Sequence, residues 1–156
     1  MKSSHSLGGV AAVCTVLWLA TSATAGPATG QAWTANGASA CERFLTPEVE
    51  AAIVVRPTSH PERLDVNSCR AGIIYVTLKV ANIDVFRQEL KMIVGVHPMS
   101  GVGDGAYWNE AGAMSAVKDH RGCDISVIGA PGQMKIHNAD LGQKLGEICN
   151  KLFALP

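Results

Sequence analysis

Four of the five cysteines in this chain lie after residue 40, at Cys41, Cys69, Cys123 and Cys149, and they limit the fold more than any other feature. If the domain is exported, an even number of cysteines is most simply explained by two disulfides. Four cysteines can pair in three ways, and their spacing does not choose among them. We take the local pairing, Cys41 with Cys69 and Cys123 with Cys149, as the prediction, because it would join a helix to a strand in each half of the domain.

The start of the chain has the three parts of a secretory signal peptide. Lys2 gives a basic start, Leu7–Ala20 is an apolar run, and Ala23-Thr24-Ala25 fits the small-residue rule for a cleavage site. The apolar run is shorter than the roughly 20 residues that span a bilayer, so we expect cleavage and not a retained membrane anchor. Residues 1–25 are therefore predicted to be a signal peptide, and the mature protein is predicted to be periplasmic or secreted with no membrane span.

Lipid anchoring is the alternative for a chain with cysteines near such a leader. A lipidated cysteine follows small residues closely behind the apolar run, whereas Cys14 lies inside the run and Cys41 lies well beyond its end. We therefore expect the mature protein to carry no lipid anchor.

The charge of the chain is balanced, with 13 Lys and Arg against 13 Asp and Glu, and neither sign forms long blocks. This balance gives no electrostatic support to a nucleic-acid partner. Residues 26–40 consist almost wholly of small and polar residues and are predicted to be a flexible linker. Residues 41–156 are then long enough for a single domain with one core.

The first half of this domain contains clear helix and strand signals. Thr46 and Pro47 predict a helix that begins at Pro47, and Glu48 and Glu50 suit its positive N-terminal end. Prolines and polar residues predict a loop over 55–68. Alternating apolar residues then predict a strand over 74–80.

A second helix is predicted over 83–94, with Asn82 or Asp84 as its cap and with an inner stripe of Phe86, Leu90 and Ile93. Short strand candidates follow at 106–110, 114–118 and 123–128, and turn residues at 119–122 separate the last two. Apolar residues at helical spacing from Leu141 to Leu152 predict a closing helix. This order, with the two expected disulfides, predicts an α+β domain in which about three helices pack on one face of an antiparallel sheet.

The segment His97–Trp108 packs three glycines, a histidine, an aspartate and two aromatic residues into a short stretch. It is not a dinucleotide fingerprint, because the third glycine comes one residue early and a strand-like sequence follows it. We predict a structural loop that acts as the hinge between the two halves of the domain. The residues that would form this loop are Pro98, Gly101, Gly103, Asp104 and Gly105.

Other site chemistries have little support in the sequence. The histidines do not occur at the paired spacings typical of metal sites, there is no Gly-x-Ser-x-Gly elbow, and there is no Cys-x-x-Cys motif. We therefore expect no metal, no cofactor and no catalytic residue. A binding groove is the remaining candidate, and it would be lined by Tyr75, Met99, Tyr107 and Trp108. These four side chains are alternatively ordinary core, which is the commoner fate of aromatic residues in a chain that has so few.

Several of these segments together resemble a family of small exported bacterial proteins of unknown function, many of which are lipoproteins. The resemblance rests on Ala40-Cys41 leading into Leu45–Glu48, on Cys69 before a strand, on Met99–Trp108, and on the closing leucine helix. Its most specific element is Gly101-x-Gly103-Asp104-x-Ala106-Tyr107. The layout is similar to secreted sensor-like domains of actinobacteria, some of them attached to membrane kinases. The resemblance implies export, a curved antiparallel sheet with two disulfides and a ligand or partner cleft, and it supplies no catalytic residue.

The favoured hypothesis is a non-catalytic exported domain that binds or senses a small ligand or an envelope protein. Two alternatives remain. A secreted hydrolase would need His97, Ser100 and Asp104 within hydrogen-bond reach of one another in a cleft near residues 97–108. An inhibitor or immunity-type protein would show an exposed apolar patch for its partner.

Overall fold

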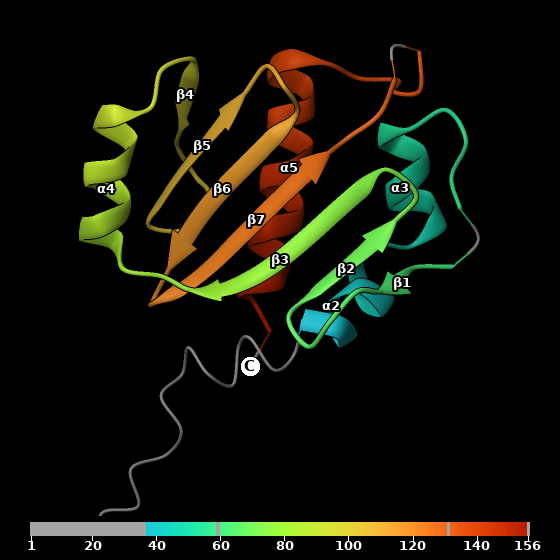
Figure 1. Cartoon of the computed structure of the whole chain (residues 1–156), viewed down its shortest axis with the longest axis horizontal. Helices are drawn as coiled ribbons and strands as arrows, with labels where there is room; N and C mark the ends of the chain where they lie inside the picture. Colours follow the sequence, from blue (N-terminus) through green and yellow to red (C-terminus); the bar gives the residue numbers. More distant parts are fainter. Residues whose placement is uncertain (1–36, 59, 131, 156) are drawn as a thin grey trace, which may run out of the picture.

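A computed structural model describes residues 37–58, 60–130 and 132–155, with only the backbone described at 37, 38, 40 and 41. The predicted signal peptide and most of the predicted linker lie outside these residues. The described chain forms four helices and one sheet of seven strands (Figure 1). The helices are α2 (Gly37–Phe44), α3 (Pro47–Ile53), α4 (Ile83–Met92) and α5 (Asn138–Phe153). The strands are β1 (Glu62–Arg63), β2 (Ser68–Ala71), β3 (Ile74–Val80), β4 (Val96–Met99), β5 (Gly105–Asn109), β6 (Ala113–Lys118) and β7 (Arg121–Val127).

The sheet is antiparallel throughout and has the strand order β1-β2-β3-β7-β6-β5-β4. It consists of two meanders, β1 to β3 and β4 to β7, which join where β3 pairs with β7. Helix α4 carries the chain from β3 to the far edge of the sheet at β4 (Figure 1). The α+β class predicted from the sequence is confirmed.

Alternation along the strands separates the two faces of the sheet. Residues paired across neighbouring strands share a face, and one face carries the buried side chains. These include the row Met114, Ile125, Val76 and Cys69 and the row Ala106, Ala116, Cys123 and Leu78. Helix α5 covers this face with its own buried stripe of Leu141, Leu145, Ile148, Cys149 and Leu152.

The helices do not all lie on that face, which corrects the sequence prediction. Phe86 of α4 stacks on Tyr107 with ring centroids 5.3 Å apart. Tyr107 alternates with the buried Ala106 and therefore points away from α5. Helix α4 thus packs on the opposite face, over β5 and β6. Of its predicted inner stripe only Phe86 is buried, whereas Leu90 is half-buried and Ile93 is 41 % exposed.

One disulfide is described, between Cys123 of β7 and Cys149 of α5, with Cα atoms 5.8 Å apart. This half of the predicted pairing is confirmed. Cys69 is also disulfide-bonded and fully buried in β2. Helix α2, which carries Cys41, packs against β2, but the side chain of Cys41 lies outside the described residues. The bond between Cys41 and Cys69 therefore stays a prediction.

Local sequence signals placed several elements correctly. Helix α3 begins at Pro47, and the Thr46 side chain accepts a hydrogen bond from Val49 N. Strand β3 has the predicted bounds, and Asp119 and His120 form the β6–β7 turn with φ of 48° and 64°. Three predictions need correction: α2 begins at Gly37 inside the predicted linker, Ser68–Ala71 at the end of the predicted loop is strand β2, and His97–Met99 belongs to strand β4.

No helix in the described part of the chain combines the length and apolarity that crossing a membrane requires.

Candidate functional site

The glycine-rich segment after His97 is the loop of a β-hairpin at one edge of the sheet. It joins β4 to β5 within one meander, so the prediction that it is a hinge between two halves is wrong. Gly101 and Gly103 have positive φ of 80° and 53°, whereas Gly105 has ordinary strand backbone. Pro98 lies in the edge strand β4, where a residue without an N–H group is tolerated.

Asn150 of α5 fastens this loop to the core. Its Nδ2 donates to the carbonyl of Gly101 at 2.8 Å, and its Oδ1 accepts from Gly103 N at 3.1 Å. The Asp104 carboxylate accepts a hydrogen bond from the backbone N–H of Asp119 at 2.9 Å. The loop is therefore held on both sides by side chains and backbone from other elements.

The hairpin does not assemble the groups that the hydrolase alternative needs. His97 stacks on Trp108 with ring centroids 4.5 Å apart, and its Nε2 lies 3.8 Å from Glu110. The Asp104 carboxylate faces the β6–β7 turn, and Ser100 is exposed. Among the described contacts no hydrogen bond joins His97, Ser100 and Asp104. The observation that would favour a triad at this position is therefore missing.

The four predicted binding residues lie on two different faces of the sheet. Met99 and Trp108 are partly buried and pack against the core cluster on the α5 side. Tyr75 and Tyr107 lie on the other face, because they alternate with the buried Ile74 and Ala106. One groove cannot use all four, and we treat the two tyrosines separately below.

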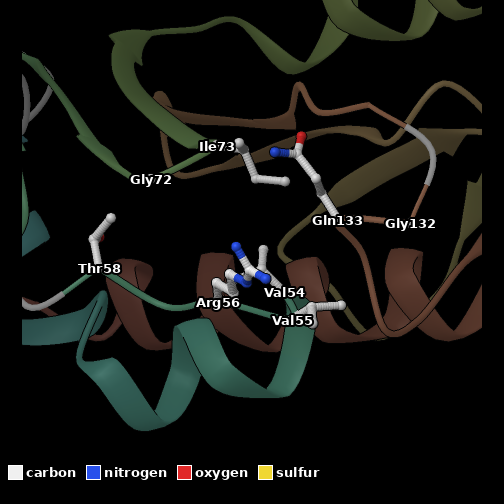
Figure 2. A pocket seen from close by; sticks show the side chains of 8 residues that line it. All are labelled: Val54, Val55, Arg56, Thr58, Gly72, Ile73, Gly132 and Gln133. Atoms are coloured by element: carbon white, nitrogen blue, oxygen red, sulfur yellow. The ribbon is translucent and has the colours of Figure 1, made fainter.

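A hollow that the sequence did not reveal, and that lies away from the β4–β5 hairpin, is a second candidate site. It has a volume of about 460 Å³ and lies between the segment that follows α3, the β2–β3 turn and the loop after β7. We call it the Arg56 pocket, and its described lining is Val54, Val55, Arg56, Thr58, Gly72, Ile73, Gly132 and Gln133. Figure 2 shows Arg56 and Val54 on the segment after α3, with Ile73 and Gln133 opposite them.

Backbone hydrogen bonds fix the two sides of the Arg56 pocket to each other. Val55 N donates to the carbonyl of Gln133 at 2.8 Å, and Lys135 N donates to the carbonyl of Ile53 at 2.7 Å. Between these bonds, Val54 forms an isolated antiparallel bridge with Met134. The segment after α3 and the loop after β7 therefore form a short antiparallel pair at the side of the Arg56 pocket.

A buried carboxylate shapes the mouth of the pocket. Glu50 is only 1 % exposed, and it accepts hydrogen bonds from Thr58 N at 2.7 Å and from Thr58 Oγ1 at 3.0 Å. These charge-assisted bonds hold the chain in a bend from α3 to Thr58, with Arg56 at its middle. The sequence assigned Glu50 to the helix start only. Its place one turn before the buried Ile53, on the inward face, is the signal that could have distinguished it.

The helix start does account for the other glutamate. Glu48 is exposed, and its pKa is lowered chiefly by a hydrogen bond with the Thr46 side chain. The two glutamates of α3 therefore have separate roles, because Glu48 stabilises the N-terminus of the helix while Glu50 fixes the loop that follows it.

The polar lining of the Arg56 pocket carries an unmatched positive charge. Arg56 makes no ion pair with any residue in the described part of the chain, and the pocket that it lines also includes the apolar residues Val54 and Ile73. The carboxylate of Glu50 accepts hydrogen bonds from Thr58 and forms no ion pair with Arg56. A ligand with an anionic group and an apolar body would match both parts of this lining.

Two further observations bear on the other hypotheses. The described residues form no group of three or more His, Cys, Asp and Glu side chains that could hold a metal ion. Three consecutive apolar residues at the end of α4, Met92, Ile93 and Val94, are 74 %, 41 % and 95 % exposed. They are the part of the surface on which an inhibitor-type partner would be sought.

Comparison of the chain with family models, with curated proteins and with solved structures finds no match. The resemblance to small exported bacterial proteins therefore stays a prediction.

Proposed function

We propose that this chain is an exported, non-catalytic binding domain that holds a small carboxylate with an apolar body in the Arg56 pocket. The observation that carries the proposal is an exposed guanidinium that has no acidic partner in the described chain and lines the same hollow as the apolar residues Val54 and Ile73. Its volume of about 460 Å³ lies within the range of small-molecule sites. Export is supported by the leader-like start of the sequence and is consistent with the Cys123–Cys149 disulfide.

The carboxylate would lie against Arg56, because a guanidinium matches a planar carboxylate better than any other side chain. The apolar body would pack between Val54 and Ile73. Each methylene that leaves water contributes up to about 0.8 kcal/mol, so affinity should rise with chain length until the pocket is full.

Isothermal titration calorimetry with hexanoate, octanoate and decanoate tests this proposal, and decan-1-ol serves as the uncharged probe. We expect decanoate to bind more tightly than hexanoate and more tightly than decan-1-ol. Arg56→Gln should weaken decanoate binding about fivefold to tenfold, since a charge-assisted hydrogen bond at an exposed site contributes about 1 to 1.5 kcal/mol. It should leave decan-1-ol binding unchanged.

Arg87→Gln is the matched control, because Arg87 is an exposed arginine on α4 whose partner is Asp84 at 3.8 Å. This variant should bind decanoate as the parent does. Equal binding of decanoate and decan-1-ol, or equal loss in the two arginine variants, would contradict the proposal.

Export is tested separately by the mature N-terminus of the protein recovered from the periplasm or the culture medium. A first residue of Gly26 supports cleavage after Ala25, whereas an intact leader in a cell extract contradicts it.

A further inference from the structure

The face of the sheet opposite α5 carries a second hollow, which we call the sheet-face groove. It has a volume of about 210 Å³ and runs from Tyr75 of β3 to Tyr107 of β5 across Ser126 of β7 and Ser115 of β6. Three strand spacings of about 4.8 Å separate the two tyrosines. In Figure 1, β3 and β7 lie in front of α5, and no helix of the described chain crosses before them.

The charges in the sheet-face groove cancel. Lys79 Nζ lies 2.6 Å from Asp124 Oδ2, and the hydroxyl of Ser115 donates to Asp124 Oδ1 at 2.5 Å. Both oxygens of the carboxylate therefore have a partner, and the ammonium is matched by it. In contrast to the Arg56 pocket, this floor offers no unmatched charge to an ion.

The rest of the lining includes several uncharged polar groups. The hydroxyls of Thr77, Ser126 and Tyr107 form no hydrogen bond with another residue of the described chain, although all three side chains are half-buried. A hydroxyl both donates and accepts. The groove thus presents several hydrogen-bonding groups of both kinds at fixed positions on a rigid sheet.

The two tyrosine rings at the ends of the groove are held by neighbours. Tyr107 stacks on Phe86 of α4, and the guanidinium of Arg70 lies 5.8 Å from the Tyr75 ring while also donating to its hydroxyl at 3.4 Å. Their positions are therefore set by packing before any ligand arrives. Pre-positioned aromatic rings lose little entropy when a ligand packs on them.

We propose that the sheet-face groove binds a neutral carbohydrate through one sugar ring. Such a ring carries several hydroxyls without charge, and its C–H face packs on aromatic side chains. A peptide strand would fit this surface less well, because the groove crosses strands that are already paired on both sides. The site is independent of the Arg56 pocket and uses none of its residues.

The test is an NMR titration of the ¹⁵N-labelled mature protein with methyl α-glucoside, methyl β-glucoside, methyl α-mannoside and methyl α-galactoside. We expect at least one of them to give saturable shifts of the backbone amides of Tyr75, Thr77 and Ser115. The amides around Arg56 should not move.

Two variants locate the site. Ser126→Phe should fill the groove and abolish the shifts, whereas Ser100→Phe places the same ring on an exposed hairpin loop and should not. Thr77→Val keeps the shape of the side chain, removes its hydroxyl and should weaken binding about threefold or more. Overlay of the parent and variant spectra shows that each variant is folded.

Three outcomes would overturn the proposal. They are the absence of saturable shifts with all four glycosides at 100-fold excess over the protein, shifts that persist in Ser126→Phe, and shifts of the groove amides by tetra-alanine but by no glycoside.

Discussion

Replacing Gly103 with alanine should destabilise this domain far more than the same change at Gly101 in the same loop. Both glycines have positive φ, at which an L-residue costs about 1 kcal/mol. A Cβ at Gly101 would meet nothing within 4 Å, whereas a Cβ at Gly103 would lie 2.4 Å from the carbonyl oxygen of Val117. Backbone cannot be moved aside as a side-chain end can, so the loop has to shift.

That shift would strain the hydrogen bonds that hold the loop. Asp104 N donates to the same Val117 carbonyl at 2.7 Å, and Gly103 N donates to Asn150 at 3.1 Å. Each such bond contributes about 1 kcal/mol, so losing both adds about 2 kcal/mol to the backbone cost. We expect Gly101→Ala to lower the free energy of unfolding by about 1 kcal/mol and Gly103→Ala by about 3 kcal/mol.

The assay is urea denaturation of the mature protein followed by far-ultraviolet circular dichroism. The midpoint should fall in both variants with an unchanged slope, which shows that stability changed and not the extent of unfolding. Equal midpoints for the two variants would refute the argument, because they would mean that the Val117 carbonyl is not where the structure places it.

Three further predictions concern the fold and the pocket mouth. Replacing Cys123 and Cys149 together with alanine should lower the free energy of unfolding by about 3.5 kcal/mol, from chain entropy over a sequence separation of 26, and non-reduced peptide mapping of the parent should recover the two cysteines in one linked fragment. Glu50→Gln should destabilise the protein by about 2 kcal/mol and weaken decanoate binding, since it removes the charge from the bonds that hold the loop after α3, whereas Glu48→Gln should leave binding unchanged. The backbone N–H of Asn67 is the chief cause of the lowered pKa of Asp65. The ionised Asp65 side chain therefore stabilises the protein above its ordinary pKa, and this stabilisation is lost as the pH falls through the lowered value. Asp65→Asn should reduce the loss of stability on acidification in urea melts between pH 5 and pH 2.

Local rules predicted the elements whose signal lies within one stretch of sequence. Strand β3 alternates buried and half-buried side chains along its length, and α5 repeats leucines at helical spacing. The turn at Asp119 and His120 was predicted because aspartate and histidine adopt positive φ more often than most residues do. Each of these patterns can be recognised without knowing which distant residues the element contacts.

Strands β2 and β4, which the sequence did not predict, are defined by their pairing with other strands. Strand β4 contains Pro98 and only four residues, and it is a strand because β5 pairs with it. Ser68–Ala71 shows no alternation, because the adjacent residues Ser68 and Cys69 are both buried, and the segment is a strand because it pairs with β3. The face on which α4 packs was equally hidden, because the contact between Phe86 and Tyr107 joins segments with a strand and a loop between them.

The candidate sites could not be predicted for the same reason. Arg56 and Gln133 come from distant parts of the chain and form no motif, and they are brought together by the backbone hydrogen bonds and the bridge between residues 53–55 and 133–135. Four side chains were predicted from the sequence to line one candidate groove, namely Tyr75, Met99, Tyr107 and Trp108. Strand alternation divides them between the two faces of the sheet. Tyr107 and Trp108 are neighbours in the sequence, but for that reason they point to opposite faces.

The most direct test of the central claim is a crystal structure of the mature protein grown with 10-bromodecanoate, in which the bromine is located by its anomalous signal. The account predicts a bromine peak in the Arg56 pocket between Val54 and Ile73, with the carboxylate within hydrogen-bond distance of the Arg56 guanidinium. A bound molecule at another place with this pocket empty, or a carboxylate that points away from Arg56, would contradict it.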